Sequence, residues 1–238
     1  MAEIRALINY KLRQNLFTHV VNETTEELKR RGTDSYLIFM KGYSLGMCGN
    51  TQAAIRELEQ LKRKREVAYP ALLALLYFHR LAKKVDRNEI ETLEVSLKTA
   101  EENVGDQGCL LASSFFLYTG DYQSARRYVT RVLRAGTKAQ TPVQIQAASL
   151  AAWIEVSRNG TTRGETDDKD EAIESLDETN MARDLDSLLV KAKYYEQQGR
   201  QKLALDQLNQ AIAMHSWFVP ALIEKAKVSF VEMSDEIF

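Results

Sequence analysis

The sequence predicts an all-α protein built from stacked helical hairpins, and two observations lead to this fold class. Apolar residues recur with helical spacing along the chain, and none of the apolar patterns has the two-residue period of a β-strand. Interruptions are few, because the 238 residues include only eleven glycines and three prolines. With 45% hydrophobic residues, the chain can bury a large core.

Three segments share a turn in which a glycine is followed, five positions later, by an alanine. The pairs are Gly49–Ala54, Gly120–Ala125 and Gly199–Ala204. Each pair lies between two helical patterns, as in the tetratricopeptide repeat, a helical hairpin of 34 residues. In that register the repeat units begin at Ser35, Asp106 and Leu185, and the same period predicts further units at Tyr69 and Val219.

Proline positions support the two units that only the period predicts. Pro70 and Pro220 directly follow the expected starts, and Pro142 opens another helical stretch. A proline in the first turn of a helix costs little, because its missing N–H would have no intrahelical partner there. We therefore expect about six hairpins and one C-terminal helix, wound into a right-handed superhelix.

Small residues occupy the positions where the two helices of each hairpin should approach most closely. Helices can pack at short distance only where their side chains are small. We therefore expect six structural positions to be buried at these contacts. They are Gly42, Ser113 and Ala192 in the first helices, and Ala54, Ala125 and Ala204 in the second helices.

Weaker hairpins fill the gaps between the clear repeats. Residues 3–31 predict two helices that meet near Gln14-Asn15, with Gly32 as the cap of the second. The helix over 69–81 pairs with a helix that Asp86 can cap. Residues 142–158 and 170–179 predict another hairpin, and the polar segment Arg158–Asp168 between them predicts a mobile loop.

Composition limits the partners and the compartment. The 32 Lys and Arg residues nearly balance the 33 Asp and Glu residues, so no net charge favours nucleic acid or anionic membranes. Cys48 and Cys109 are isolated thiols, which suits a reducing compartment. The N-terminus lacks the apolar core of a signal peptide, and no apolar run approaches the roughly 20 residues of a membrane span. We expect a cytoplasmic protein without direct membrane insertion.

Two motifs that could bind nucleotides or an import receptor have simpler explanations. Gly42, Gly46 and Gly49 lack a following Lys-Ser or Lys-Thr, and their surroundings are helical, so close helix packing and a turn explain them better than a phosphate loop. The basic run at 62–65 falls at the end of a predicted second helix, where cations favour the helix dipole.

Candidate metal ligands and general bases are equally weak. His19, His79 and His215 lie in different repeats without carboxylate or cysteine partners at ligand spacing, so we expect structural roles. The acidic run at 167–171 lacks the alternating ligands and central glycine of a calcium loop. The sequence therefore predicts no catalytic residue, no metal, no cofactor and no small-molecule substrate.

The candidate partner-binding surface is the concave face, which first helices form in tetratricopeptide proteins. The repeat register places a set of mostly aromatic side chains there, and such residues often anchor protein interfaces. The set is Tyr36, Phe39, Tyr43, Met47, Tyr77, Leu110, Leu117 and Tyr118. The alternative is that a tightly wound superhelix buries them against neighbouring helices.

Four segments carry a more specific resemblance, which spans nearly the whole chain. They are Ala6–Tyr10, Leu72–His79, Ala151–Ile154 and Trp217–Ala221. In this order they resemble the N-terminal region of the large tetratricopeptide subunit of intraflagellar transport complex A, the tetratricopeptide repeat protein 21 family. The resemblance implies a scaffold for retrograde ciliary transport and cargo entry, located at the cilium and its base, with other complex A subunits as partners. The chain departs from the repeat by lacking its usual proline at position 32, and the segment Arg158–Asp168 looks longer than in the family.

Two other functional classes stay open. One is an adaptor that binds a peptide in its concave groove, such as a cochaperone-type repeat. Cochaperone-type members of the repeat class grip an acidic C-terminus with Lys and Asn side chains. This chain has Ile4, Ile8 and Met40 at the corresponding positions. An enzyme would need a polar pocket that this sequence does not display.

The last predicted helix, Pro220–Met233, lacks a second helix to complete its hairpin. Phe230, Ile237 and Phe238 would then have no apolar neighbour. We therefore expect residues 1–238 to form a single repeat domain that is the N-terminal piece of a longer solenoid.

Overall fold

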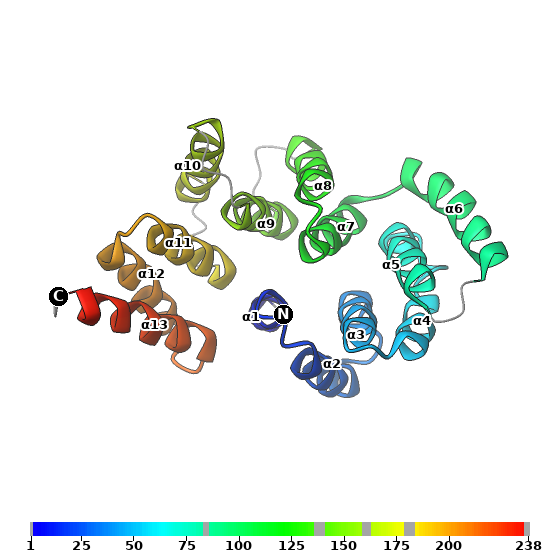
Figure 1. Ribbon diagram of the computed structural model, residues 1–238, viewed down its shortest axis with the longest axis horizontal. Helices are drawn as coiled ribbons and strands as arrows, with labels where there is room; N and C mark the ends of the chain where they lie inside the picture. The colour runs from blue at the N-terminus through cyan, green and yellow to red at the C-terminus, as the bar shows by residue number, and fades with distance from the viewer. Residues whose placement is uncertain (1, 83–85, 136–140, 159–162, 179–183, 236–238) are drawn as a thin grey trace. The chain divides into compact units, whose positions relative to one another are not determined.

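The fold is entirely helical in the part of the chain that the structure describes. The computed structural model describes residues 2–82, 86–135, 141–158, 163–178 and 184–235. Thirteen α-helices and no β-strand occur within these ranges (Figure 1). This confirms the all-α class, and thirteen is the number of helices that six hairpins and one further helix contain. The hand of the superhelix stays a prediction.

The helices group into two compact units. The N-terminal unit spans Lys11–Ala135, and the C-terminal unit combines Met1–Tyr10 with Gly136–Phe238. Helix α1 (Ala2–Arg13) therefore contributes most of its residues to the C-terminal unit. The expectation of a single domain over residues 1–238 stays a prediction.

The N-terminal unit contains seven complete helices. They are α2 (Phe17–Arg31), α3 (Ser35–Met47), α4 (Thr51–Glu59), α5 (Ala68–Leu81), α6 (Arg87–Glu102), α7 (Asp106–Thr119) and α8 (Tyr122–Ala135). Within the hairpins, α3 packs on α4, α5 packs on α6 and α7 packs on α8. Helix α5 also packs on α7, the first helix of the next hairpin. The first helices therefore stack side by side.

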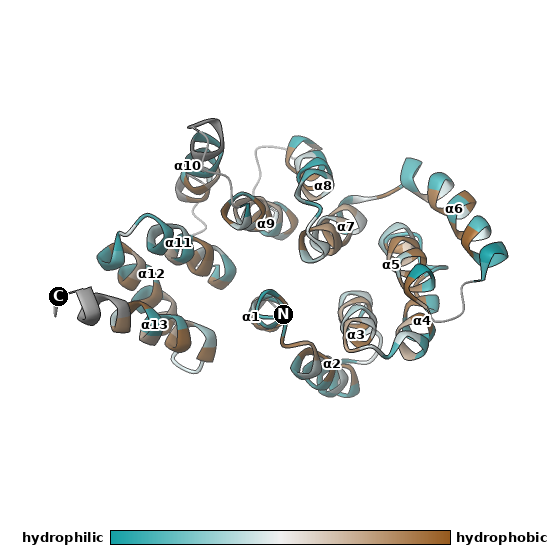
Figure 2. Cartoon of the chain, viewed as in Figure 1, coloured by the Kyte–Doolittle hydropathy of each residue, from teal (hydrophilic) through white to brown (hydrophobic). Residues whose placement is uncertain are grey.

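The C-terminal unit repeats this arrangement. Its helices, besides the first residues of α1, are α9 (Pro142–Ser157), α10 (Arg163–Glu178), α11 (Leu185–Gln197), α12 (Gln201–Met214) and α13 (Val219–Asp235). Helix α9 packs on α10 and α11, while α12 packs on both α11 and α13. Figure 2 shows the first helices α5, α7 and α9 as more hydrophobic than their partners α6, α8 and α10.

The predicted glycine turns are confirmed. Gly120 ends α7 in the left-handed conformation with φ of 83°, and its N–H donates to the carbonyl oxygens of Leu117 and Phe116. A residue with a Cβ atom is strained at such an angle, which explains the choice of glycine. Gly49 and Gly199 adopt the same sign of φ at 84° and 69°.

Helix starts also follow the sequence signals. The side chain of Asp86 accepts hydrogen bonds from the backbone N–H groups of Asn88 and Glu89, which confirms it as the cap of α6. Thr141 caps α9 through the N–H of Gln144, with Pro142 at the first helical position. These residues satisfy backbone donors that would otherwise lack partners.

The small residues lie where they were predicted to lie. Ala54, Ala125 and Ala204 are fully buried, and Gly42, Ser113 and Ala192 are also buried. A Cβ atom placed on Gly42 would meet Leu58 Cγ at 2.8 Å, closer than real Cβ contacts allow. The Ser113 hydroxyl donates to the carbonyl oxygen of Ala125 at 2.8 Å, so these two helices are joined at the same contact.

One sequence prediction is wrong. The segment Arg158–Asp168 was expected to be a loop, but α10 begins at Arg163; residues 159–162 lie outside the described residues. Gly164 lowers local helix propensity by about 1 kcal/mol relative to alanine. The helix is anchored by Ile173, 4% exposed, and by an ion pair of 3.6 Å between Asp168 and Arg158, so tertiary contacts outweigh this local preference.

Candidate functional site

The predicted concave face of the N-terminal unit is partly interior. Tyr43 of α3 is 1% exposed, and its ring lies 5.9 to 6.3 Å, between centroids, from the rings of Phe17, Phe78, Phe115 and Tyr118. Its hydroxyl donates to the carbonyl oxygen of Tyr118 at 3.3 Å. Burial raises the pKa of Tyr43 well above its ordinary value, and the neighbouring phenols of Tyr118 and Tyr77 raise it further. This phenol is therefore a neutral donor within an aromatic core.

Burial divides the predicted binding residues into two groups. Phe39, Leu110 and Leu117 are buried like Tyr43, so these four side chains form core rather than open surface. That outcome corrects their assignment to a partner-binding face, and its cause is the close packing of neighbouring first helices. The other four are half-buried and stay predicted contact residues: Tyr36, Met47, Tyr77 and Tyr118.

A hydrogen-bonded network joins three helices of the N-terminal unit. The Tyr128 hydroxyl of α8 donates to Glu101 Oε1 of α6 at 2.7 Å, and it also shares a hydrogen bond with the hydroxyl of Tyr69 of α5. Arg127 donates to the same Glu101 oxygen at 2.7 Å. Burial is the main cause that raises the pKa of both tyrosines, so both remain protonated. The network fixes α6 and α8 relative to α5.

A cleft of about 660 Å³ lies beside α5 and α6. It is lined by Lys62, Arg65, Ala68, Leu72, Val95, Ser96, Thr99, Ala100 and Asn103. Apolar side chains thus adjoin two cations, of which Arg65 is exposed. The prediction that the basic run at 62–65 lies at the end of a helix is wrong, because α4 ends at Glu59 and the run belongs to the connection that borders this cleft.

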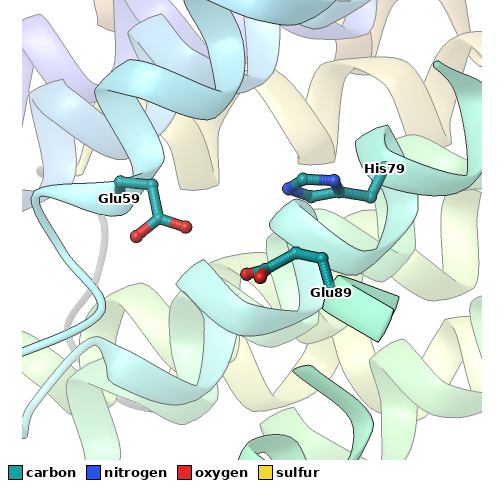
Figure 3. A group of neighbouring side chains, drawn as sticks. All are labelled: Glu59, His79 and Glu89. Carbon is teal, nitrogen blue, oxygen red and sulfur yellow. The ribbon is translucent and has the colours of Figure 1, made fainter. Parts of the chain in front are cut away.

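Three possible metal ligands meet near this cleft (Figure 3). Glu59 comes from the end of α4, His79 from α5 and Glu89 from α6, and their ligand atoms lie within 4.8 Å of one another. His79 has no carboxylate partner at ligand spacing in the sequence, and the packing of the helices brings two carboxylates to it. Sequence spacing could not reveal the group, because the three residues belong to three helices whose packing brings them together.

Imidazole and carboxylate groups are ordinary ligands for zinc, and this group supplies three of the four that a closed site needs. A cation is already present in the form of Lys62. Its ammonium nitrogen lies 3.4 Å from Glu59 Oε1 and 3.5 Å from Glu89 Oε1. The group therefore acts in this structure as an ion-paired link between α4 and α6.

In the C-terminal unit, α9 and α11 are joined by a small polar cluster. The hydroxyls of Ser149 and Ser187 lie 2.6 Å apart, and both hydrogen-bond to Asp184 Oδ2 at 3.1 and 3.0 Å. Asp184 also caps α11 through the N–H of Ser187. Burial raises the pKa of Asp184, and the nearby charge of Asp186 raises it further.

Within the described part of the chain, no helix is both long enough and apolar enough to cross a membrane.

Paired helices, glycine turns and small-residue contacts define this chain as a helical-repeat protein of the α-solenoid class. A family model described as "Tetratricopeptide repeat protein 21 N-terminal ARM repeat" matches residues 8–234. The chain therefore belongs to this family. The description refers to an armadillo-type repeat, another α-solenoid repeat, whereas the helices seen here follow one another in pairs.

Individual relatives support the same assignment. Tetratricopeptide repeat protein 21B of Homo sapiens is 30% identical over 227 residues, which cover 95% of this chain and 16% of that protein. The Xenopus laevis protein of the same name is 29% identical, and the match covers 94% of this chain and 16% of that protein. Tetratricopeptide repeat protein 21A of Homo sapiens is 27% identical, and the match covers 95% of this chain and 16% of that protein. At 16% of their length, the chain spans about one sixth of these curated relatives.

The half-buried charge of Asp184 leads to a prediction about pH. Because its folded pKa is raised, the folded state holds this proton more tightly than the unfolded state, and the wild type loses stability as pH rises from 3.8 through the raised value. Asp184→Asn keeps a capping acceptor without the charge, so it should gain stability relative to wild type over this window. Urea unfolding at several pH values measures the difference.

Asp184→Ala is the matched comparison, since it removes the charge and the cap together. It should be less stable than Asp184→Asn at every pH, by about 0.5–2 kcal/mol for the lost cap. If the stability of Asp184→Asn changed with pH in parallel with wild type, the inferred role of the Asp184 charge would be wrong.

Proposed function

We propose that this chain is a non-catalytic protein-interaction scaffold that acts as a subunit of intraflagellar transport complex A. The observation that carries the proposal is the family match over residues 8–234. Its role is to hold other complex A subunits during retrograde ciliary transport and ciliary cargo entry. The proposed location is the cytoplasm, the cilium and the ciliary base.

The fold suits such a role. Stacked hairpins present a long surface whose shape is set by a rigid core, and repeat proteins use such surfaces to bind other proteins. The half-buried side chains of Tyr36, Met47, Tyr77 and Tyr118 are the proposed contacts with other subunits. Aromatic side chains are effective interface anchors because they bury a large area at little entropic cost.

A generic adaptor that binds a peptide is the second candidate. The cleft of about 660 Å³ beside α5 and α6 favours it, because exposed Arg65 could meet an acidic group while apolar residues line the interior. The cochaperone type is disfavoured, because Ile8 and Met40 are fully buried and leave no Lys or Asn clamp at those positions.

Affinity purification of the tagged chain from ciliated cells separates these functions. The proposal expects other complex A subunits to be enriched over an untagged control. Enrichment of heat-shock proteins in their place would favour the cochaperone adaptor. Failure to recover any complex A subunit would refute the proposed function.

A substitution pair tests the proposed contact surface. Tyr77→Ser removes a half-buried ring of α5, and we expect at least a fivefold loss of co-purified complex A subunits, because losing a central aromatic anchor typically costs more than about 1 kcal/mol. Leu81→Ser alters a 59% exposed residue of the same helix and should retain binding. Circular dichroism checks that both variants fold; equal recovery with the two would show that Tyr77 is not a contact.

The C-terminal helix carries a second proposed contact. Val219, Leu222 and Ile223 of α13 are 41% to 55% exposed, and at 3.6 residues per turn they share a face with Phe230, which is 75% exposed. A contiguous exposed apolar stripe marks an interaction site. The curated relatives are about six times longer than this chain, which covers 16% of them. We infer that in the full-length protein a further helical hairpin of the solenoid packs on this stripe.

Amide hydrogen exchange tests this proposal. In a dilute monomer, α13 should exchange faster than α5, because its apolar stripe is exposed to solvent whereas most of α5 is buried. Extending the chain by the next natural hairpin should slow exchange in α13 and leave α5 unchanged. The proposal fails if α13 is already as protected as α5 in residues 1–238.

A further inference from the structure

Three side chains from three helices of the N-terminal unit converge on one point. Figure 3 shows the side chains of Glu59, His79 and Glu89 directed towards a common space. Their candidate ligand atoms all lie within 4.8 Å of one another. A tetrahedral zinc ion with bonds of about 2.0–2.2 Å places its ligand atoms roughly 3.3–3.6 Å apart. The largest separation in this group therefore needs to shorten by at most about 1.5 Å, which rotation about the outer bonds of the two Glu side chains can supply.

The backbone holds these three residues in place, whereas their side chains stay accessible. Glu59 is the last residue of α4 and follows the fully buried Leu58. His79 lies in the last turn of α5 and follows the fully buried Phe78. Glu89 lies in the first turn of α6, where its backbone N–H donates to the capping side chain of that helix at 3.2 Å. All three side chains are half-buried, so an ion can reach them from solvent.

The imidazole of His79 is available as a ligand. Among the residues that the structure describes, none forms a hydrogen bond or an ion pair with this ring. One nitrogen of a neutral imidazole carries a lone pair, and this is the atom that binds zinc and other transition metals. The imidazole distinguishes the group from an ordinary acidic cluster, because Mg²⁺ and Ca²⁺ prefer oxygen ligands alone.

The two carboxylates share one cation at long distance. Lys62 Nζ lies 3.4 Å from Glu59 Oε1 and 3.5 Å from Glu89 Oε1. Strong charge-assisted hydrogen bonds are shorter, at about 2.7–2.9 Å. Lys62 also belongs to the connection after α4 rather than to a helix. A divalent ion would neutralise both carboxylates and bind the imidazole as well, so it can displace the ammonium group.

We propose that Glu59, His79 and Glu89 form a zinc-binding site in which Lys62 is the competing cation. Zinc takes one atom from each of the three side chains and a water molecule as its fourth ligand. Because the ligands belong to α4, α5 and α6, the bound ion links three consecutive helices and stabilises their packing. The proposal replaces the sequence-based prediction that the chain binds no metal, and it does not depend on the proposed ciliary role.

Zinc titration tests the site directly. Residues 1–238 are freed of metal with EDTA, exchanged into buffer without chelator and titrated with zinc chloride in a calorimeter. The wild type should bind one zinc ion per chain, and its melting temperature should rise with zinc. His79→Gln and Glu89→Gln should each bind zinc at least about tenfold more weakly, because even the loss of a group that only orients a ligand typically costs about 10–100-fold. Excess Mg²⁺ should not compete, because the site includes an imidazole.

Lys62→Gln should change zinc affinity in the direction opposite to that of the ligand variants. It removes the competing cation, so zinc should bind at least about threefold more tightly. His215→Gln is the matched control, because His215 Nδ1 also lies beside a carboxylate, 3.4 Å from Glu3 Oε1, but outside this group. Its zinc affinity should equal that of the wild type. Circular dichroism checks that each variant folds.

Weaker binding by the folded ligand variants together with tighter binding by Lys62→Gln would support the proposal. If His79→Gln or Glu89→Gln does not fold, the direction of change in Lys62→Gln decides. The proposal is overturned if the wild type binds no zinc, if Mg²⁺ competes, or if Lys62→Gln does not bind more tightly than the wild type. Unchanged affinity in the folded ligand variants, or an equal loss in His215→Gln, would also overturn it.

Discussion

The close approach of paired helices at small residues is the constraint on which the structure depends. Where α3 meets α4, Leu58 leaves no space for a Cβ atom on Gly42, with a distance of 2.8 Å to Leu58 Cγ. Where α7 meets α8, the Ser113 hydroxyl reaches the carbonyl oxygen of Ala125 at 2.8 Å. Such short separations fix the two helices of a hairpin relative to each other, because packed interiors tolerate little change in volume.

This close packing explains why the aromatic residues of the first helices act differently from one position to the next. Tyr43 lies among four other rings and belongs to the core, although its register position suggested a concave surface. Tyr77 lies 5.7 Å, between ring centroids, from Phe115 and is still half-exposed. Neighbouring first helices are close enough to bury some of these rings and leave the edges of others for a partner.

Much of the fold could be predicted from local signals. Gly120 ends α7, Asp86 caps α6 and Pro142 opens α9 because the backbone at these places needs particular residue types, and such needs are visible in one sequence. The start of α10 could not be found in this way, since burial of Ile173 outweighs the weak propensity near Gly164.

The candidate sites were less predictable for a related reason. His79 meets Glu59 and Glu89 only through the packing of α4, α5 and α6. Asn9 and Trp153 both bind Asp186, although the three are far apart in the sequence. Repeat spacing describes neighbours within a hairpin, whereas these contacts join residues with no common register. The segments Ala6–Tyr10 and Ala151–Ile154 carry a family pattern in the sequence. That pattern gives no indication that the two segments bind the same carboxylate.

The stability of Ala204→Leu tests the role of small-residue contacts most directly. Ala204 of α12 is fully buried, and adding a larger side chain to a packed contact typically costs about 1–3 kcal/mol. Ala213→Leu makes the same change at an exposed position of α12 and serves as the control. The account predicts that Ala204→Leu lowers the free energy of unfolding by at least about 1 kcal/mol relative to Ala213→Leu in urea titrations. Equal stability of the two variants would contradict it.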